Sequence, residues 1–195
     1  KFTNFLVNDL NWDYRENLFD NGFVGRFLGN LKNINYETRN VETFKEDSTN
    51  EIYGSLGYLS KINLQRINDF SSHLLTPKML LRYAPGGMRK EEDGFRLDPI
   101  RAFSLNRLDN VNNYETGLTS TIGVDYEYKK NNNNFNFSVA QIINAEENKK
   151  MPSKSSMDEK LSDVVGFSSI VLDNKFKLNY NFALDQNFED LNYSE

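Results

Sequence analysis

The sequence contains no cysteine, so neither a disulfide nor a thiolate metal site can form within these 195 residues. That absence does not fix the compartment, because oxidising compartments permit disulfides without requiring them. Basic residues are outnumbered, since 23 Lys and Arg stand against 28 Asp and Glu and the net charge is -5. This mild acidity gives no support for nucleic-acid binding, which needs a basic patch.

Long hydrophobic runs are also missing. No stretch of about 18 apolar residues occurs, which excludes a transmembrane helix from the sequence. Only 38% of the residues are hydrophobic, yet 13% are aromatic. A disordered chain would be poor in aromatics, so the composition indicates a folded one. A polar average with many aromatics suits a β-barrel, whose lumen face is polar.

Groups that could carry catalysis are scarce. The single histidine is His73, and a catalytic interpretation would pair it with Ser71 or Ser72. Neighbours in sequence do not make a dyad, so a solvated loop histidine is the favoured interpretation. An acidic run could gather calcium oxygens but lacks the EF-hand spacing, which favours a solvated charge run. Its members are Glu91, Glu92, Asp93 and Asp98. We therefore expect no enzyme, no cofactor and no metal site.

The strongest positive signal is an alternation from Tyr114 to Tyr128. The even positions are largely apolar with tyrosines at both ends, and the odd positions are small or charged. A period of two predicts a strand with a different environment on each face. The same pattern returns from Phe176 to Leu184. Strands of globular sheets usually have about 5–6 residues, whereas a transmembrane strand needs roughly 9–11.

Eight strands of this kind can be placed along the chain. We predict them at residues 5–14, 23–36, 51–64, 75–83, 114–128, 135–145, 163–172 and 176–185. The first can continue to Leu18 in the same register, and the alternation in the second is weak. Pro77 would interrupt the hydrogen bonds between a central strand and its neighbour, because proline has no N–H to donate.

The predicted connections alternate in length. Short ones fall at residues 20–22, 129–134 and 173–174, a modest one precedes residue 75, and long polar ones cover 40–50, 84–113 and 146–161. Outer-membrane barrels have short periplasmic turns and longer external loops, whereas a soluble sandwich has no reason to sort its loops in this way. We predict an all-β fold, an antiparallel meander of about eight strands that forms a partial transmembrane β-barrel open at both edges.

The chain starts at Lys1 without a signal peptide, although an outer-membrane protein must be exported. We therefore expect residues 1–195 to be a fragment of one outer-membrane β-barrel domain.

Two sets of side chains are candidates for membrane contact. Basic residues of the long connections could hold lipid phosphates by charge-assisted hydrogen bonds, unless acidic neighbours compensate them. They are Arg89, Lys90, Arg96, Arg101, Arg107, Lys149, Lys150 and Lys154. We consider three tyrosines as candidates for an aromatic girdle at the membrane–water boundary, namely Tyr114, Tyr126 and Tyr128. The tyrosine ring is apolar, whereas its hydroxyl group can bond to water. Cross-strand aromatic packing in a soluble sheet is the alternative.

Three strings carry a family resemblance. "LLTPKMLLRYAPGGMR" (residues 74–89), "FSLNRLDNVNNYETGLTSTIGVDY" (103–126) and "MPSKSSMDEKLSDVVG" (151–166) resemble the barrel domain of the lipopolysaccharide-assembly outer-membrane proteins (LptD/OstA type). The most specific part is the pair Asn106–Arg107 followed by Tyr-Glu-Thr-Gly-Leu from Tyr114 to Leu118.

The resemblance implies a large barrel in the cell outer membrane that inserts lipopolysaccharide into the outer leaflet. Its implied partners are lipopolysaccharide, membrane lipid, a plug lipoprotein in the lumen and a periplasmic transport bridge. The lipid is expected to leave where the first and last strands of the barrel meet. The family's inter-domain disulfides cannot be carried over, because this chain has no cysteine. A passive pore or receptor barrel and a soluble secreted β-sandwich that binds a partner remain open alternatives.

Overall fold

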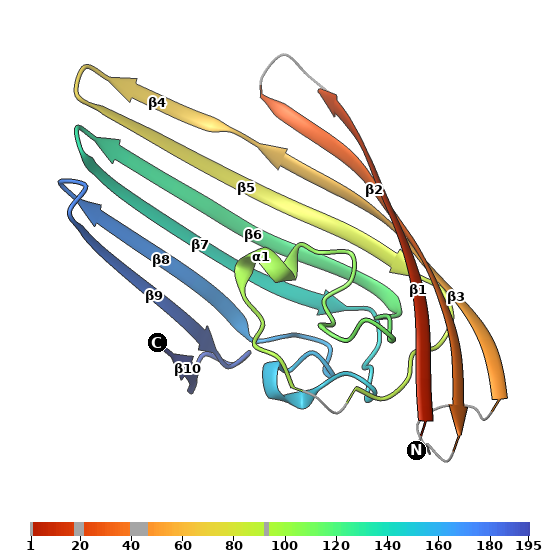
Figure 1. The fold of residues 1–195 in the computed structure, drawn as a ribbon. Coiled ribbons are helices and arrows are strands. Elements are labelled where there is room, and N and C mark those ends of the chain that lie inside the picture. Colours follow the sequence, from red (N-terminus) through yellow and green to blue (C-terminus); the bar gives the residue numbers. More distant parts are fainter. Residues whose placement is uncertain (1, 18–21, 40–46, 92–93) are drawn as a thin grey trace.

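The computed structural model describes residues 2–17, 22–39, 47–91 and 94–195. They form one ten-stranded sheet in which all neighbouring strands are antiparallel (Figure 1). The strands are β1 (Phe2–Asn17), β2 (Phe23–Arg39), β3 (Asp47–Ile62), β4 (Leu64–Asn68), β5 (Ser71–Ala84), β6 (Gly117–Lys130), β7 (Asn133–Asn144), β8 (Val164–Leu172), β9 (Phe176–Leu184) and β10 (Leu191–Ser194). The order is β1-β2-β3-β5-β6-β7-β8-β9-β10, and β4 also pairs with β5. The predicted all-β antiparallel meander is confirmed.

The strand count differs from the prediction of eight, because the sheet contains ten strands. After Asn63 the chain continues as β4 against the same partner, so the predicted third strand extends further and is divided in two. The four-residue β10 is too short to show a periodicity. Strand β3 begins at Asp47, so part of the predicted polar stretch at 40–50 is strand; residues 40–46 lie outside the described residues.

The short turns lie at one end of the sheet and the long connections at the other (Figure 1). Asp173 and Asn174 both have positive φ, 50° and 55°, as the predicted tight turn between β8 and β9 requires. Of the turn predicted at residues 20–22, Asp20 and Asn21 lie outside the described residues. Pro77 does lie inside a central strand, β5.

The pleat gives the sheet two different faces. Apolar side chains that the register places on one face are widely exposed. This outward set includes Leu10, Trp12, Phe27, Leu56, Leu75, Met79, Leu81, Tyr83, Leu118, Ile122, Leu178 and Tyr180. It contains the apolar face that alternation predicted for Phe176–Leu184.

Two aromatic rings on this outward face lie across glycines of the neighbouring strand. Trp12 is paired with Gly29, and a Cβ on that glycine would meet the indole at 2.0 Å. Phe182 lies in the same way on its partner Gly166. Each glycine provides the flat site that the ring occupies.

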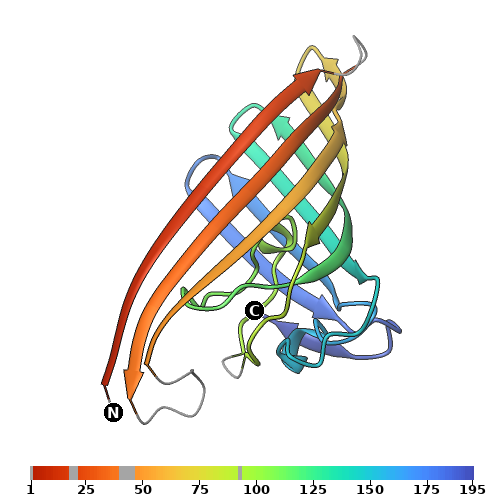
Figure 2. The same ribbon diagram turned by 90° about the vertical axis from the view of Figure 1, so that its right-hand side faces the viewer.

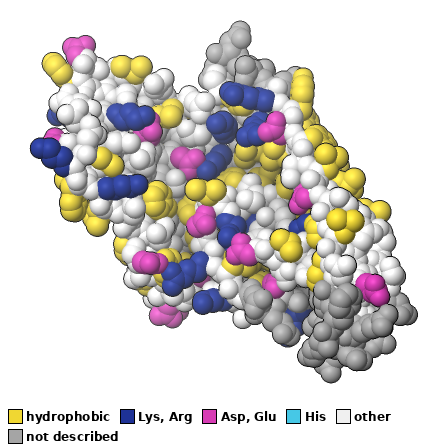
Figure 3. All heavy atoms as spheres, in the orientation of Figure 1, with side chains coloured by type: hydrophobic (Ala, Val, Ile, Leu, Met, Phe, Trp, Pro, Cys, Tyr) yellow, Lys and Arg dark blue, Asp and Glu magenta, His cyan; other side chains and the backbone are white. Residues whose placement is uncertain are grey.

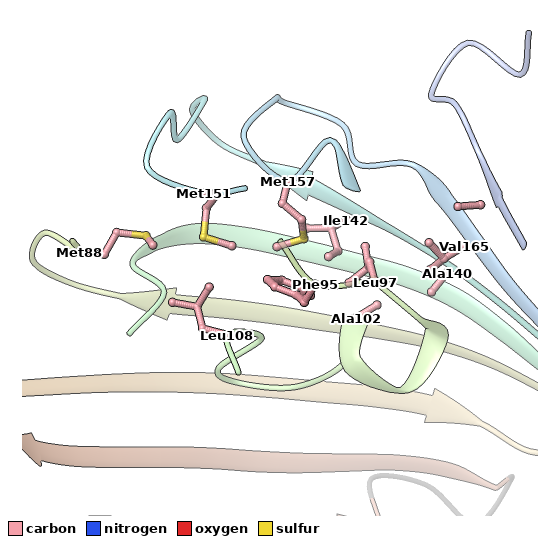
Figure 4. Close-up of a cluster of buried hydrophobic side chains, with 11 residues drawn as sticks. Met88, Phe95, Leu97, Ala102, Leu108, Ala140, Ile142, Met151, Met157 and Val165 are labelled. Carbon is pink, nitrogen blue, oxygen red and sulfur yellow. The ribbon is translucent and has the colours of Figure 1, made fainter. Parts of the chain in front are cut away.

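The opposite face is concave and holds a long connection, residues 85–116, which we call the inner segment (Figures 1 and 2). It carries the short helix α1 (Pro99–Ala102). Its apolar residues pack on inward side chains of the strands that follow, such as Ala140 and Ile142 on β7, to form the main core (Figure 4). The core therefore lies between the sheet and the inner segment, on one side of the sheet only.

Candidate functional site

The concave face and the inner segment form the most elaborately built part of the molecule, so we describe them as the candidate site. Figure 3 shows basic and acidic side chains distributed over this face. The helix α1 fixes the segment against the sheet. Asp98 caps the helix by accepting hydrogen bonds from the backbone N–H groups of Ile100 and Arg101, both at 2.8 Å. The hydroxyl of Thr121 on β6 donates to the carbonyl of Ala102 at 2.9 Å.

A buried charged cluster consists of Arg82, Arg107 and Glu115, each at most 2% exposed. Arg107 donates from Nε and Nη2 to the two oxygens of Glu115, at 2.8 and 2.6 Å. Arg82 on β5 donates to the backbone carbonyls of Leu105 and Glu115. The cluster thus joins the sheet to both ends of residues 105–115.

The charges of this cluster do not balance, because two guanidinium groups face one carboxylate. Burial and the neighbouring Arg82 lower the pKa of Arg107 from its ordinary value, and the Glu115 carboxylate acts in the opposite direction. The hydroxyl of Thr119 gives the Arg107 guanidinium group a further partner, because it accepts a hydrogen bond from Nη2 at 2.8 Å. A buried ion cluster of this kind is weak evidence for a gain in stability, because removing the charges from water costs free energy.

Tyr114 occupies the interior beside this cluster. It is fully buried, stacks on Tyr53 of β3 at 5.9 Å between ring centroids, and its hydroxyl lies 2.5 Å from that of Ser55. Burial raises the pKa of Tyr114 above its ordinary value. Strand β6 starts only at Gly117. The predicted place of Tyr114 in an outward girdle is therefore corrected.

The predicted girdle residues Tyr126 and Tyr128 do lie on the outward face, near the short turns. Both are half-buried against His73, whose Nδ1 lies 2.9 Å from the Tyr126 hydroxyl. The rings of His73 and Tyr128 are 4.7 Å apart between centroids. His73 belongs to β5, so its interpretation as a loop residue is wrong. The role of the two tyrosines in a membrane girdle stays a prediction.

The predicted basic residues divide into paired and exposed ones. Arg89 pairs with Glu51 of β3 and lies over the Tyr36 ring. Three others have carboxylate partners: Arg96 with Glu195, Arg101 with Asp109, and Lys149 with Glu147. Exposed side chains are found at Lys90, Lys150 and Lys154. Acidic neighbours thus compensate most of the set, and contact with lipid head groups stays a prediction.

Of the acidic run considered for calcium, the two described members make other contacts. Glu91 instead bonds to Asn113, whose Nδ2 lies 3.1 Å from its Oε2, and Asp98 caps α1. Glu92 and Asp93 lie outside the described residues. Within the described ranges no group of acidic or histidine side chains could hold a metal ion.

The loop end of β1–β3 differs from the rest of the sheet. β3 pairs with β5 only from Leu56 to Lys61, so among the described residues no strand lies beside residues 47–55 on that side. On the outward face of this region asparagines bond both along β2 and across to β3. Asn35 donates to Asn33 at 2.6 Å and accepts from Asn50.

Among the described residues no helix is long and apolar enough to cross a membrane. The sheet exposes a largely apolar convex face and has most of its charged strand residues on the concave one. The family model for LptD, described as LPS transport system D, matches residues 30–195. The chain belongs to the LptD family. A comparison with curated proteins gives no match.

The LptD match covers the inner segment and the charged cluster. Sequence reasoning placed Asn106, Arg107 and Glu115 within the family-like string, but it gave no role to Arg82, Tyr53 or Ser55. The dipeptide Asp98–Pro99 is an N-cap followed by proline, a signal that could have predicted α1. No spacing in the sequence signals the charged cluster.

Proposed function

We propose that this chain forms part of the wall of an outer-membrane β-barrel that inserts lipopolysaccharide into the outer leaflet. The LptD match supports the transport role. The observation that carries the proposal is the contrast between the two faces of a single sheet, since a transmembrane barrel wall is apolar toward lipid and polar toward the lumen. By family resemblance a plug lipoprotein and a periplasmic transport bridge are its partners.

The experiment uses cells depleted of the full-length protein and supplied with a plasmid copy. Surface lipopolysaccharide is measured with an antibody on intact cells and compared with the total in lysates. Depletion should lower the surface fraction while the total remains. A copy with Leu81→Arg, which charges the convex face, should reach the outer membrane poorly. Phe70→Arg places the same charge on an exposed apolar residue of a short turn and should restore transport.

A passive pore or receptor barrel is the second candidate, because it would have the same two faces. Unchanged surface lipopolysaccharide after depletion, together with ion conductance in planar bilayers, would favour it. Copurification with a plug lipoprotein would favour the transport role. The soluble β-sandwich is disfavoured, because the described strands form one sheet.

A further inference from the structure

The outward face changes character at its short-turn end, where β4, β5 and β6 lie side by side (Figure 1). One directly paired row across these strands consists of Leu64, Leu75 and Tyr126. The next outward row toward the turns consists of Arg66, His73 and Tyr128. The last outward row consists of Asn68, Ser71 and Lys130. The outward face of these strands therefore passes from apolar to basic and polar within three rows.

The length of β5 places this change at a definite level of a barrel wall. The outward positions of β5 run from Ser71 to Tyr83, and His73 precedes Tyr83 by ten residues. At about 3.3 Å per residue, those ten residues span roughly 33 Å of strand. Barrel strands are tilted by about 35–45°, so this length covers about 25 Å across the membrane, the usual height of the apolar band. Under the proposed function, the row of His73 would therefore lie at the level of the lipid head groups.

The charge at this end of the outward face is positive. Arg66 and Lys130 are exposed, and neither forms an ion pair within the described ranges. The carboxylates of β6, Asp125 and Glu127, belong to the opposite face, where each pairs with a lysine. Asp69, in the turn itself, is the only acidic residue between positions 64 and 84. Two basic side chains thus face at most one carboxylate, which favours an anionic ligand.

His73 adds a directed polar group between the two bases. Its Nδ1 lies 2.9 Å from the Tyr126 hydroxyl, and its ring packs on Tyr128 at 4.7 Å between centroids. Because Tyr126 occupies Nδ1, Nε2 is the nitrogen that can bond to a ligand. Arg66 is paired directly with His73, whereas Lys130 lies two strands away from Arg66 and one row nearer the turns. The strand spacing and rise put the Cα atoms of Arg66 and Lys130 roughly 12 Å apart, so both long side chains can reach one anion held over β5.

We propose that Arg66, His73 and Lys130 form a head-group site that binds the phosphate of an anionic glycerophospholipid, such as phosphatidylglycerol. The site rests on the proposed function, because it requires the apolar outward face to lie in a bilayer. A guanidinium and an ammonium group form charge-assisted hydrogen bonds to phosphate oxygens. A zwitterionic lipid brings an ammonium group of its own, so two basic side chains favour the anionic lipid over it. The lipid belongs to the leaflet on the short-turn side, which is periplasmic in outer-membrane barrels.

The test uses the full-length protein in nanodiscs of phosphatidylglycerol and phosphatidylethanolamine in equal amounts. A diazirine near the glycerol end of one acyl chain is carried by phosphatidylglycerol in one sample and by phosphatidylethanolamine in the other. After irradiation and digestion, mass spectrometry gives the ratio of label from the two probes on each peptide. We expect this ratio to be roughly fivefold higher on peptides of β4–β5 than on those of β8–β9. The outward side chains at the short-turn end of β9, Phe176 and Leu178, are apolar and offer the phosphate no charge.

The decisive variant combines Arg66→Gln with Lys130→Gln and should lower the ratio on β4–β5 to that on β8–β9. The matched control combines Lys175→Gln with Lys177→Gln, which removes the same charge from the β8–β9 hairpin at the same end of the sheet. It should leave the ratio on β4–β5 unchanged, and circular dichroism checks that both variants keep their strand content.

The outcomes separate the head-group site from the proposed function. An unchanged ratio in the first variant, or an equal loss in both variants, would overturn the head-group site alone. Displacement of the phosphatidylglycerol label by equimolar lipopolysaccharide would overturn the phospholipid assignment. Absence of label from both hairpins with either probe would contradict the proposed function itself.

Discussion

At the scale of single residues, the two ring–glycine pairs show how the outward face is shaped. A cross-strand pair that involves an aromatic ring contributes roughly 0.2–1 kcal/mol. Here the partner has no side chain, so the ring of Trp12 lies flat on the backbone and remains about half exposed, at 48%. The glycines are required by contact with the ring, since Gly29 and Gly166 are not among the residues with positive φ.

The first prediction concerns Gly29. Replacing it with alanine should displace the Trp12 ring, because the new Cβ would meet the indole at 2.0 Å. We expect a loss of about 1 kcal/mol and a shift in tryptophan fluorescence, which reports on Trp12 as the only tryptophan of these 195 residues. Gly54→Ala is the matched control, since its Cβ would find only ordinary contacts beyond 3.4 Å. Equal effects of the two changes would contradict the packing described.

The second prediction concerns the charged cluster. Glu115→Gln leaves the buried guanidinium groups of Arg82 and Arg107 without their carboxylate, which should cost about 3–5 kcal/mol. The loss should appear as faster hydrogen exchange and proteolysis in the inner segment. Asp109→Asn removes the carboxylate partner of Arg101 at the surface and should cost about 0–1 kcal/mol. Unchanged protection of the segment in Glu115→Gln would show that the cluster does not hold it.

At the scale of elements, the sequence predicts strands and their faces well but not what covers them. Alternation placed Leu75, Met79 and Leu81 on one face, because the pleat imposes a period of two whatever the tertiary context. The same alternation continued through Tyr114 and Thr116, although both are buried in the inner segment. The period cannot distinguish the end of a strand from an extended loop. The Arg107–Glu115 contact depends on how that segment folds back, which leaves no local signal.

The third prediction compares the two faces of β9. Tyr180→Arg should cost about 2–4 kcal/mol if the residue lies near the bilayer midplane, because under the proposed function the outward face meets hydrocarbon. Replacement of Asn181 by alanine should cost little, because its side chain lies on the other face. The measurement is denaturant unfolding in lipid vesicles. Similar losses at both positions would contradict the assignment of faces.

At the scale of the whole molecule, the sheet is open. β1 lies at one end of the strand order and β10 at the other, and no pairing between them occurs among the described residues. Each end presents unpaired N–H and C=O groups, which invite aggregation in water and are not tolerated in lipid. The predicted opening at both edges agrees with this arrangement. The transmembrane placement of the sheet belongs to the proposed function.

The fourth prediction follows from these edges. The isolated 195-residue chain should be insoluble in plain buffer and should not form a defined monomer by itself. Analytical ultracentrifugation with and without detergent tests this expectation. A soluble monomer that unfolds cooperatively without detergent would refute it.

The stretch of β3 that has a partner strand on one side only also bears on how deeply the sheet could enter a membrane. Among the described residues no strand pairs with residues 47–55 on that side, and unpaired backbone groups cannot face hydrocarbon. If the sheet is a barrel wall, as proposed, we expect the hydrocarbon layer to end near Leu56 on this strand. Tyr83 is paired with Leu56 on β5, and tyrosine is a side chain suited to a membrane–water boundary. The hydrogen-bonded asparagines beyond it would then lie on the aqueous side. Under the proposed function, the lack of a second partner strand would thus limit how deeply this part of the sheet enters the bilayer.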